Sequence, residues 1–171
     1  MQKKLRLGVV GCGLAASKLH GTGYKELDEI ELVACTDRER NYESRTVPVA
    51  AEFGARAYKN VDEMLTDDSI EAVDVCVKEP GHFEIARKAL LAGKHVLCEK
   101  ALTDDLASAR ELESIAKDKG LKFMVNYNYR YMATVVELKS RIDAGEFGDL
   151  AFLSISGHGY TFHHSSVLMR Y

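Results

Sequence analysis

The stretch that decides the fold is LRLGVVGCGLAA, residues 5–16, close to the start of the chain. Its first half is a short apolar run typical of a buried strand, and it leads directly into the pattern Gly11-x-Gly13-x-x-Ala16. The first glycine permits a tight turn, the second lets a phosphate approach the backbone, and the small third residue lets a helix pack close to the strand. The N–H groups at the start of that helix can bind phosphates. We therefore expect Gly11, Gly13, Leu14, Ala15 and Ala16 to contact a dinucleotide; a purely structural glycine turn is the alternative.

Outward from this stretch, short apolar runs alternate with longer amphipathic ones. The predicted strands are Leu5–Val10, Glu31–Thr36, Arg56–Tyr58, Ala72–Val77, His95–Cys98 and Lys122–Val125. The predicted helices are Ala15–Lys25, Val49–Phe53 after Pro48, His82–Ala92, and Asp104–Lys119 with Thr103 as its N-cap. Such alternation builds βαβ units with right-handed crossovers, so the sequence predicts an α/β fold with a doubly wound parallel sheet, the Rossmann fold.

The residue after the second predicted strand is Asp37, and it strengthens the prediction of a dinucleotide site. A carboxylate at this place can accept hydrogen bonds from the ribose hydroxyls of the adenosine half. It would also repel a ribose 2′-phosphate, which makes NAD the preferred cofactor over NADP. Arg38 weakens this preference, because its guanidinium could stack on adenine or neutralise a 2′-phosphate.

Beyond Val125 the pattern changes. A helix is predicted at Met132–Ala144, followed by a turn at Gly145–Gly148 and an alternating strand at Leu150–Ser156. We therefore place the dinucleotide-binding domain at residues 1–122 and the beginning of a second, α+β domain at residues 123–171.

Composition excludes several classes of function. Lys and Arg number 23 against 26 Asp and Glu, for a net charge of −3, and the basic residues are not clustered, so no nucleic-acid footprint is predicted. No apolar run is long enough to span a membrane. The four cysteines form no CxxC pair and lie in apolar segments, which favours buried thiols and a cytoplasmic location. His158, His163 and His164 lack a carboxylate or cysteine partner, so we predict a flexible tail or strand end there and no metal site.

A second stretch is more specific. GKHVLCEK, residues 93–100, resembles the "aGkhVlcEKP" signature of the glucose–fructose oxidoreductase / inositol dehydrogenase / rhizopine catabolism family of NAD(P)-dependent oxidoreductases. Further motifs resemble the same family in the right order from Leu5 to about Gly157. They are Ala72–Val77, His82, Ala89-Leu90, Asn128–Tyr131 and Gly145–Gly148.

This resemblance implies roles for individual residues. Lys100 would be the catalytic residue, beside the nicotinamide and the reacting hydroxyl, where an ammonium can stabilise negative charge on the substrate oxygen. Glu99 would contact the nicotinamide ribose or orient Lys100. The remaining implied cofactor contacts are Val77, Lys78, Pro80, His82, Asn128 and Arg130.

The sequence also departs from the family pattern. Ala101 replaces the proline after Glu-Lys, so we expect no cis bond there and a different aim for Lys100. The pair Lys78-Glu79 replaces a Thr-Pro loop, and the glycine-led helix with the family's acid/base Asp and His is missing.

Taken together, the resemblance implies an enzyme that transfers a hydride between a nicotinamide cofactor and a sugar, cyclitol or related polyol. The family's second domain carries substrate specificity and often the oligomer interface; here only its stub is expected, so a homo-oligomer is expected if the complete domain is present. In isolation these 171 residues are expected to bind the cofactor with little or no activity. The alternative is a non-catalytic dinucleotide-binding module, acting as a sensor or as half of an assembly.

Overall fold

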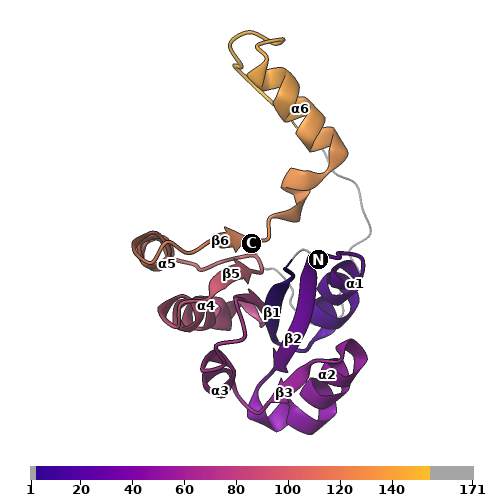
Figure 1. The fold of residues 1–171 in the computed structure, drawn as a ribbon. Helices are drawn as coiled ribbons and strands as arrows, with labels where there is room; N and C mark the ends of the chain where they lie inside the picture. The colour runs from indigo at the N-terminus through magenta and orange to yellow at the C-terminus, as the bar shows by residue number, and fades with distance from the viewer. Residues whose placement is uncertain (1–2, 155–171) are drawn as a thin grey trace, which may run out of the picture. The chain divides into compact units, whose positions relative to one another are not determined.

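The computed structural model describes residues 3–154, and the chain divides after Tyr127 into two units, Met1–Tyr127 and Asn128–Tyr171. The first unit is built on one six-stranded sheet (Figure 1). Its strands are β1 (Leu5–Val10), β2 (Ile30–Thr36), β3 (Arg56–Tyr58), β4 (Ala72–Val75), β5 (His95–Cys98) and β6 (Phe123–Val125).

All neighbouring strands pair in parallel, in the order β3-β2-β1-β4-β5-β6. This is the strand order of the dinucleotide-binding Rossmann fold, and it confirms the predicted fold class. The order reverses between β1 and β4, and ligands of such sheets bind outside the carboxyl ends of the strands at that reversal.

Helical segments cover both faces of the sheet (Figure 1). One face carries η1 (Ala15–His20), α1 (Gly21–Lys25), η3 (Tyr42–Thr46) and α2 (Val47–Phe53); the other carries α3 (Val61–Leu65), α4 (His82–Leu91) and α5 (Leu106–Asp118). Two short 3₁₀ turns, η2 (Glu39–Asn41) and η4 (Glu79–Gly81), lie in the loops after β2 and β4.

The core follows the two-residue period of the strands. Val10 joins Val73, Val75, Leu90 and Leu112 in the larger cluster, whose helical members come from α3, α4 and α5. The preceding residue, Val9, packs instead with Ala16 and Cys76 on the opposite face. The four cysteines are free and buried, as expected.

Two local predictions were wrong. The N-cap of α5 is Asp105, whose side chain accepts a hydrogen bond from the Ser108 amide at 2.7 Å, and Thr103 lies two residues before this cap. A carboxylate is a strong N-cap because it accepts a hydrogen bond from a first-turn amide that lacks an intrahelical partner.

Residues 150–154 adopt no regular structure, so the strand predicted from Leu150 is absent in that part; a lone strand without a pairing partner leaves its backbone groups unsatisfied. The other two residues of the predicted strand lie outside the described range.

The second unit contains the 3₁₀ turn η5 (Asn128–Tyr131) and the helix α6 (Ala133–Asp143). Gly145, with φ +74°, follows the helix in the left-handed conformation expected for a C-terminal stop. His158, His163 and His164 lie outside the described residues.

Within residues 3–154, no helix combines the length and apolar character that crossing a bilayer requires.

Candidate active site at the carboxyl edge of the sheet

The last residues of five strands lie in register, which places the residues that follow them along one edge. Val10 pairs with Thr36 and Val75, Val75 pairs with Cys98, and Cys98 pairs with Val125. The backbone ladder continues one step further, because the amides of Gly11, Cys76, Glu99 and Asn126 donate to carbonyls of neighbouring strands at 2.8–3.0 Å. These residues are therefore fixed by the sheet itself and not by flexible loops.

The glycine turn has the geometry that its motif predicts. Gly11 has φ +98°, and a Cβ there would lie 2.7 Å from the carbonyl oxygen of Cys76, so only glycine fits. Gly13 is different, because a Cβ there would meet no atom within 4 Å. The open space beside Gly13 is where a pyrophosphate would need to approach the backbone. The loop therefore fits a dinucleotide.

Asp37 is tied to the glycine turn. Its Oδ2 accepts a hydrogen bond from the Cys12 amide at 2.9 Å, while Oδ1 accepts from the Arg38 amide and from the Asn41 side chain. Each carboxylate oxygen can accept two hydrogen bonds, so Oδ2 retains an acceptor position for a ribose hydroxyl.

A cleft of about 370 Å³ opens at this edge of the sheet. Five residues predicted to contact the cofactor line it, namely Asp37, Arg38, Val77, Lys78 and Pro80. Its lining is Val10, Asp37, Arg38, Glu39, Asn60, Val61, Val77, Lys78, Pro80, Gly81, Glu84 and Ile85. The cleft's walls come from the loops after β2 and β4, the starts of α3 and α4, and the end of β1. The cleft therefore lies at the edge of the sheet where ligands of such folds bind.

A second cleft, of about 500 Å³, lies between the loops after β4 and β5, and its lining includes Pro80, Phe83 and Ala101. His82 connects the same two loops. It is 1% exposed, and its ring nitrogens lie 2.6 Å from the carbonyl oxygen of Ala101 and 2.8 Å from that of Val77. His82 therefore lies beneath the loops and holds them together.

The expectation that Ala101 removes the cis bond was wrong. The peptide bond between Lys100 and Ala101 is cis although the second residue is not proline. The Ala101 carbonyl is the one held by His82, so contacts of the loop fix the backbone at this point in place of a proline ring.

Glu99 and Lys100 follow β5 directly. The Glu99 carboxylate is held at both oxygens: Oε1 accepts from the Asn126 amide group at 2.6 Å and contacts Nε2 of His20 at 2.9 Å, and Oε2 accepts from the backbone N–H of Lys100 at 3.2 Å. The Lys100 side chain is exposed. A carboxylate held by three hydrogen-bonding contacts is therefore followed in the chain by an exposed lysine.

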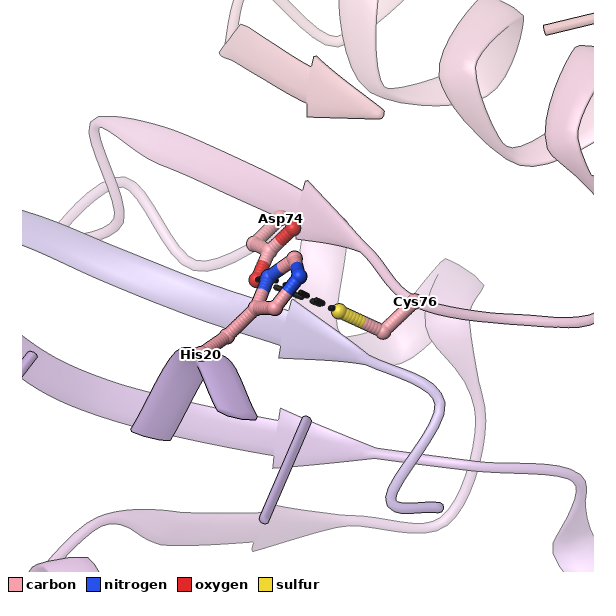
Figure 2. A group of neighbouring side chains, drawn as sticks. All are labelled: His20, Asp74 and Cys76. Carbon is pink, nitrogen blue, oxygen red and sulfur yellow. Dashed lines mark hydrogen bonds and ion pairs between the residues drawn. The ribbon is translucent and has the colours of Figure 1, made fainter. Parts of the chain in front are cut away.

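Behind Glu99 lies a buried polar group that the sequence analysis did not assign to the site. Figure 2 shows His20, from η1, pointing toward Asp74 of β4 and Cys76 just after it. Nδ1 of His20 lies 2.8 Å from Oδ2 of Asp74, and the same oxygen accepts from the Tyr24 hydroxyl at 2.8 Å and from the Cys76 thiol at 3.2 Å. Asp74 is 0% exposed, and its other oxygen has no hydrogen-bond partner among the described residues.

The charges of this group influence one another. Hydrogen bonding to Asp74 raises the pKa of His20 above its ordinary 6.5 despite the opposing effect of burial, and Glu99 adds to the rise. Burial acts to raise the pKa of Glu99, but hydrogen bonds from Asn126 and His20 outweigh it and the pKa falls below its ordinary 4.5. Burial and the charge of Asp74 raise the pKa of Tyr24 and of Cys76, so both remain neutral donors.

The predicted residues thus divide into two sets. The glycine turn, Asp37, Arg38, the loop after β4 and Glu99-Lys100 all lie at the carboxyl edge of the first unit. Asn128 and Arg130 lie on η5 in the second unit, so their contact with a cofactor stays a prediction.

The comparisons with known proteins agree with this geometry. Residues 5–127 match the GFO/IDH/MocA family, described as an oxidoreductase family with an NAD-binding Rossmann fold. The chain is 33% identical over 154 residues to glucose-6-phosphate 3-dehydrogenase of Bacillus subtilis, covering 90% of this chain and 41% of the relative. It is 29% identical to the scyllo-inositol 2-dehydrogenase (NADP(+)) of the same organism, covering 91% of this chain and 42% of the relative.

A solved structure gives the same result. The 3-ketoreductase KijD10 of Actinomadura kijaniata, in complex with NADP and TDP-benzene, superposes with a TM-score of 0.76 at 29% identity, covering 84% of this chain and 43% of that one. The chain spans about two fifths of the length of the curated relatives that it matches. With the family matched over most of its residues, the chain belongs to the Gfo/Idh/MocA family of NAD(P)-binding oxidoreductases.

Proposed function

We propose that this chain supplies the cofactor half of an active site that transfers a hydride between NAD(P) and a carbinol carbon of a sugar, cyclitol or related polyol. The observation that supports this best is the position of Gly11 and of Glu99-Lys100 after β1 and β5, on either side of β4 at one edge of the sheet. The names of relatives, which include a sugar phosphate dehydrogenase and an inositol dehydrogenase, support the class of substrate.

The residues of this chain would act as follows. The space beside Gly13 would receive the pyrophosphate, and Asp37 would accept a ribose hydroxyl. Val77, Lys78 and Pro80 would line the path of the cofactor, with His82 holding the loops in place. When bound, the nicotinamide supplies the hydride acceptor or donor.

Lys100 would be the catalytic residue. Its ammonium would donate a hydrogen bond to the substrate oxygen and stabilise the negative charge that develops as the hydroxyl proton leaves. The proton itself would pass to a general base supplied elsewhere in the complete active site. A protein of this family with a full second domain would also assemble into a homo-oligomer.

For the choice of nucleotide we propose NAD, because the Asp37 carboxylate at the glycine turn would repel a 2′-phosphate. The inositol dehydrogenase relative and the 3-ketoreductase carry NADP in their descriptions, and exposed Arg38 is a residue that could neutralise such a phosphate. Titration of the chain with NADH and with NADPH tests this choice. Tighter binding of NADPH would contradict the NAD proposal and leave dinucleotide binding intact.

Turnover tests the enzymatic part of the proposal. In the longest natural form of the protein, a panel of sugars and cyclitols should include one that reduces NAD(P), and Lys100→Met should abolish that turnover while cofactor binding persists. Lys119→Met, the same exchange at the end of α5 away from the carboxyl edge, is the matched control and should keep full activity. Equal activity of Lys100→Met and the unchanged protein would contradict the role of Lys100.

A second candidate is a non-catalytic dinucleotide-binding module. The charged pair Lys78-Glu79, which stands where the family pattern has a Thr-Pro loop, favours it. Cofactor binding without turnover on the same panel would support the module over the enzyme.

A further inference from the structure

His20 lies at the centre of a polar group that joins the helical segments η1 and α1 to the strands β4, β5 and β6 of the first unit. It faces Asp74 through Nδ1 and Glu99 through Nε2, at 2.8 and 2.9 Å. Tyr24, Cys76 and Asn126 complete its surroundings, the first two donating to Asp74 and the third to Glu99. Its side chain is 10% exposed, so solvent contributes little to its partners.

The contacts of the two ring nitrogens favour one protonation state. The Asn126 side-chain amide lies 3.3 Å from Nε2 of His20 but only 2.6 Å from Oε1 of Glu99, so it donates to Glu99 and leaves Nε2 facing the carboxylate. A neutral imidazole donates from one nitrogen only, whereas a carboxylate can only accept. Both nitrogens of His20 lie within hydrogen-bond distance of a carboxylate oxygen, so both need a proton if both carboxylates are ionised. The resulting imidazolium has one positive charge between two negative ones. For Asp74, fully buried and otherwise bonded to neutral donors, this is the compensating charge that a buried carboxylate requires.

This arrangement also determines where Glu99 can be. His20 and Asn126 hold Oε1 of Glu99, and Oε2 accepts from the peptide N–H of Lys100. Removal of His20 would leave Glu99 with one side-chain partner and would leave Asp74 without a counter-charge. Because Glu99 accepts a hydrogen bond from the Lys100 N–H, a mobile Glu99 would also hold the Lys100 backbone less firmly.

We propose that His20 is a positioning residue: as an imidazolium between Asp74 and Glu99, it fixes Glu99 and the Lys100 peptide for the nicotinamide half of the dinucleotide. The proposal rests on the proposed function of the site. It extends that function from the residues that would touch the cofactor to the buried group beneath them.

The same atoms allow one other interpretation. Imidazole, carboxylate and thiolate are ligands that transition metals use, and donor atoms of His20, Asp74 and Cys76 lie within 4.8 Å of one another (Figure 2). A ring nitrogen bound to a metal carries no proton, whereas the 2.8 Å separation of Nδ1 and Oδ2 is that of a hydrogen bond and requires one. The short contact therefore favours a proton over a metal ion, and the protonation of the ring nitrogens distinguishes the two.

The first measurement is NMR of the histidine ring nitrogens in the ¹⁵N-labelled 171-residue chain. We expect both nitrogens of His20 to carry protons at neutral pH. His95 is the internal reference, because its Nδ1 accepts a hydrogen bond from the Lys122 amide at 3.0 Å and therefore carries no proton. A His20 ring with one unprotonated nitrogen, whether neutral or bound to a metal, would overturn the proposal.

The second measurement compares the affinities of NADH and ADP, which differ by the nicotinamide riboside. His20→Asn should lower the affinity for NADH by roughly tenfold relative to that for ADP, since it removes one charge-assisted hydrogen bond to Glu99. In the unchanged chain, the ratio of the two affinities should fall as the pH rises through the raised pKa of His20. His95→Asn, at the amino end of β5, should change neither affinity.

The outcomes are distinct. An equal loss of both affinities in His20→Asn, or no loss at all, would overturn the positioning role while the proposed function stands. Failure of the unchanged chain to bind either nucleotide would overturn the proposed function and the positioning role with it. The ring-nitrogen spectra report on the imidazolium in either case, and they do so even if His20→Asn fails to fold.

Discussion

Substitution by alanine should affect the two glycines of the same turn differently: at Gly11 it should lower stability, and at Gly13 it should lower the affinity for NADH. Gly11→Ala places a Cβ at φ +98° and within 2.7–2.9 Å of three backbone atoms of Cys76 and Val77. A left-handed backbone alone costs an L-residue about 1–2 kcal/mol, and the backbone contact adds to this, so we expect a loss of about 3 kcal/mol in the free energy of unfolding. For a unit of this size that corresponds to a decrease of about 10 °C in Tm.

Gly13→Ala should behave differently, because its Cβ would meet no protein atom within 4 Å. Stability should stay within about 0.5 kcal/mol of the unchanged chain. The methyl group would instead occupy the space that the pyrophosphate needs, so the Kd for NADH should rise at least tenfold, or about 1.4 kcal/mol. Gly23→Ala, within α1 and also without close neighbours, is the matched control and should leave the Kd unchanged.

Thermal denaturation followed by circular dichroism measures the first effect, and fluorescence titration with NADH measures the second. Unchanged NADH binding by Gly13→Ala would refute the assignment of the pyrophosphate to this turn. A Gly11→Ala chain as stable as the unchanged one would refute the argument from its conformation and close contact with Cys76.

Three further predictions concern stability. The pKa of His20 is raised, so its contribution to the free energy of unfolding is fully present below pH 6.5 and is lost as the pH rises through its folded-state pKa. The pKa of Glu99 is lowered, so its contribution is present above pH 4.5 and is lost as the pH falls through its folded-state pKa. Urea unfolding across this range should show maximal stability from the pair between pH 4.5 and 6.5, and His20→Asn should remove the decrease above pH 6.5; an unaltered decrease would contradict the assignment. Leu112→Ala, at a side chain with no exposed surface in the larger core cluster, should cost about 2.7–5 kcal/mol by urea unfolding, and a cost below 1 kcal/mol would contradict its central place in the core. Asp105→Ala should lower the Tm more than Thr103→Ala does, because Asp105 caps α5; the reverse order would restore Thr103 as the cap.

The fold could be predicted from the sequence because local pattern and tertiary structure agree. The apolar runs at residues 5–10, 56–58 and 95–98 form strands with the bounds expected. The predicted helices of the first unit connect strands that pair in parallel. The edge of the sheet was predictable for the same reason, since a motif that follows a strand of a parallel sheet must lie at its carboxyl end. The helix α3 was not predicted because it spans only five residues. Its signal was present in Asn60, whose side chain accepts from the Glu63 amide at 2.8 Å in an Asn-x-x-Glu capping arrangement.

The buried group around His20 could not be assembled from sequence, although each part left a signal. Asp74 is an acid inside an apolar strand, which predicts a buried partner, and it shares a face of the sheet with Cys76 two residues later. His20 and Tyr24 are four residues apart and therefore share a helical face. The missing information was that these two faces meet across 54 residues of chain. The cis bond before Ala101 was missed because residue type alone argues against it.

The central claim is that a dinucleotide lies along the carboxyl edge of the sheet, from the glycine turn to Lys100. Backbone amide NMR of the labelled chain during titration with NADH tests it most directly. We predict saturable shifts for the amides of Gly13, Asp37 and Lys100, and none for Ile30 and His95 at the amino ends of β2 and β5. Saturation with NADH or NADPH that leaves Gly13 and Lys100 unmoved, or shifts confined to the amino edge, would contradict the account.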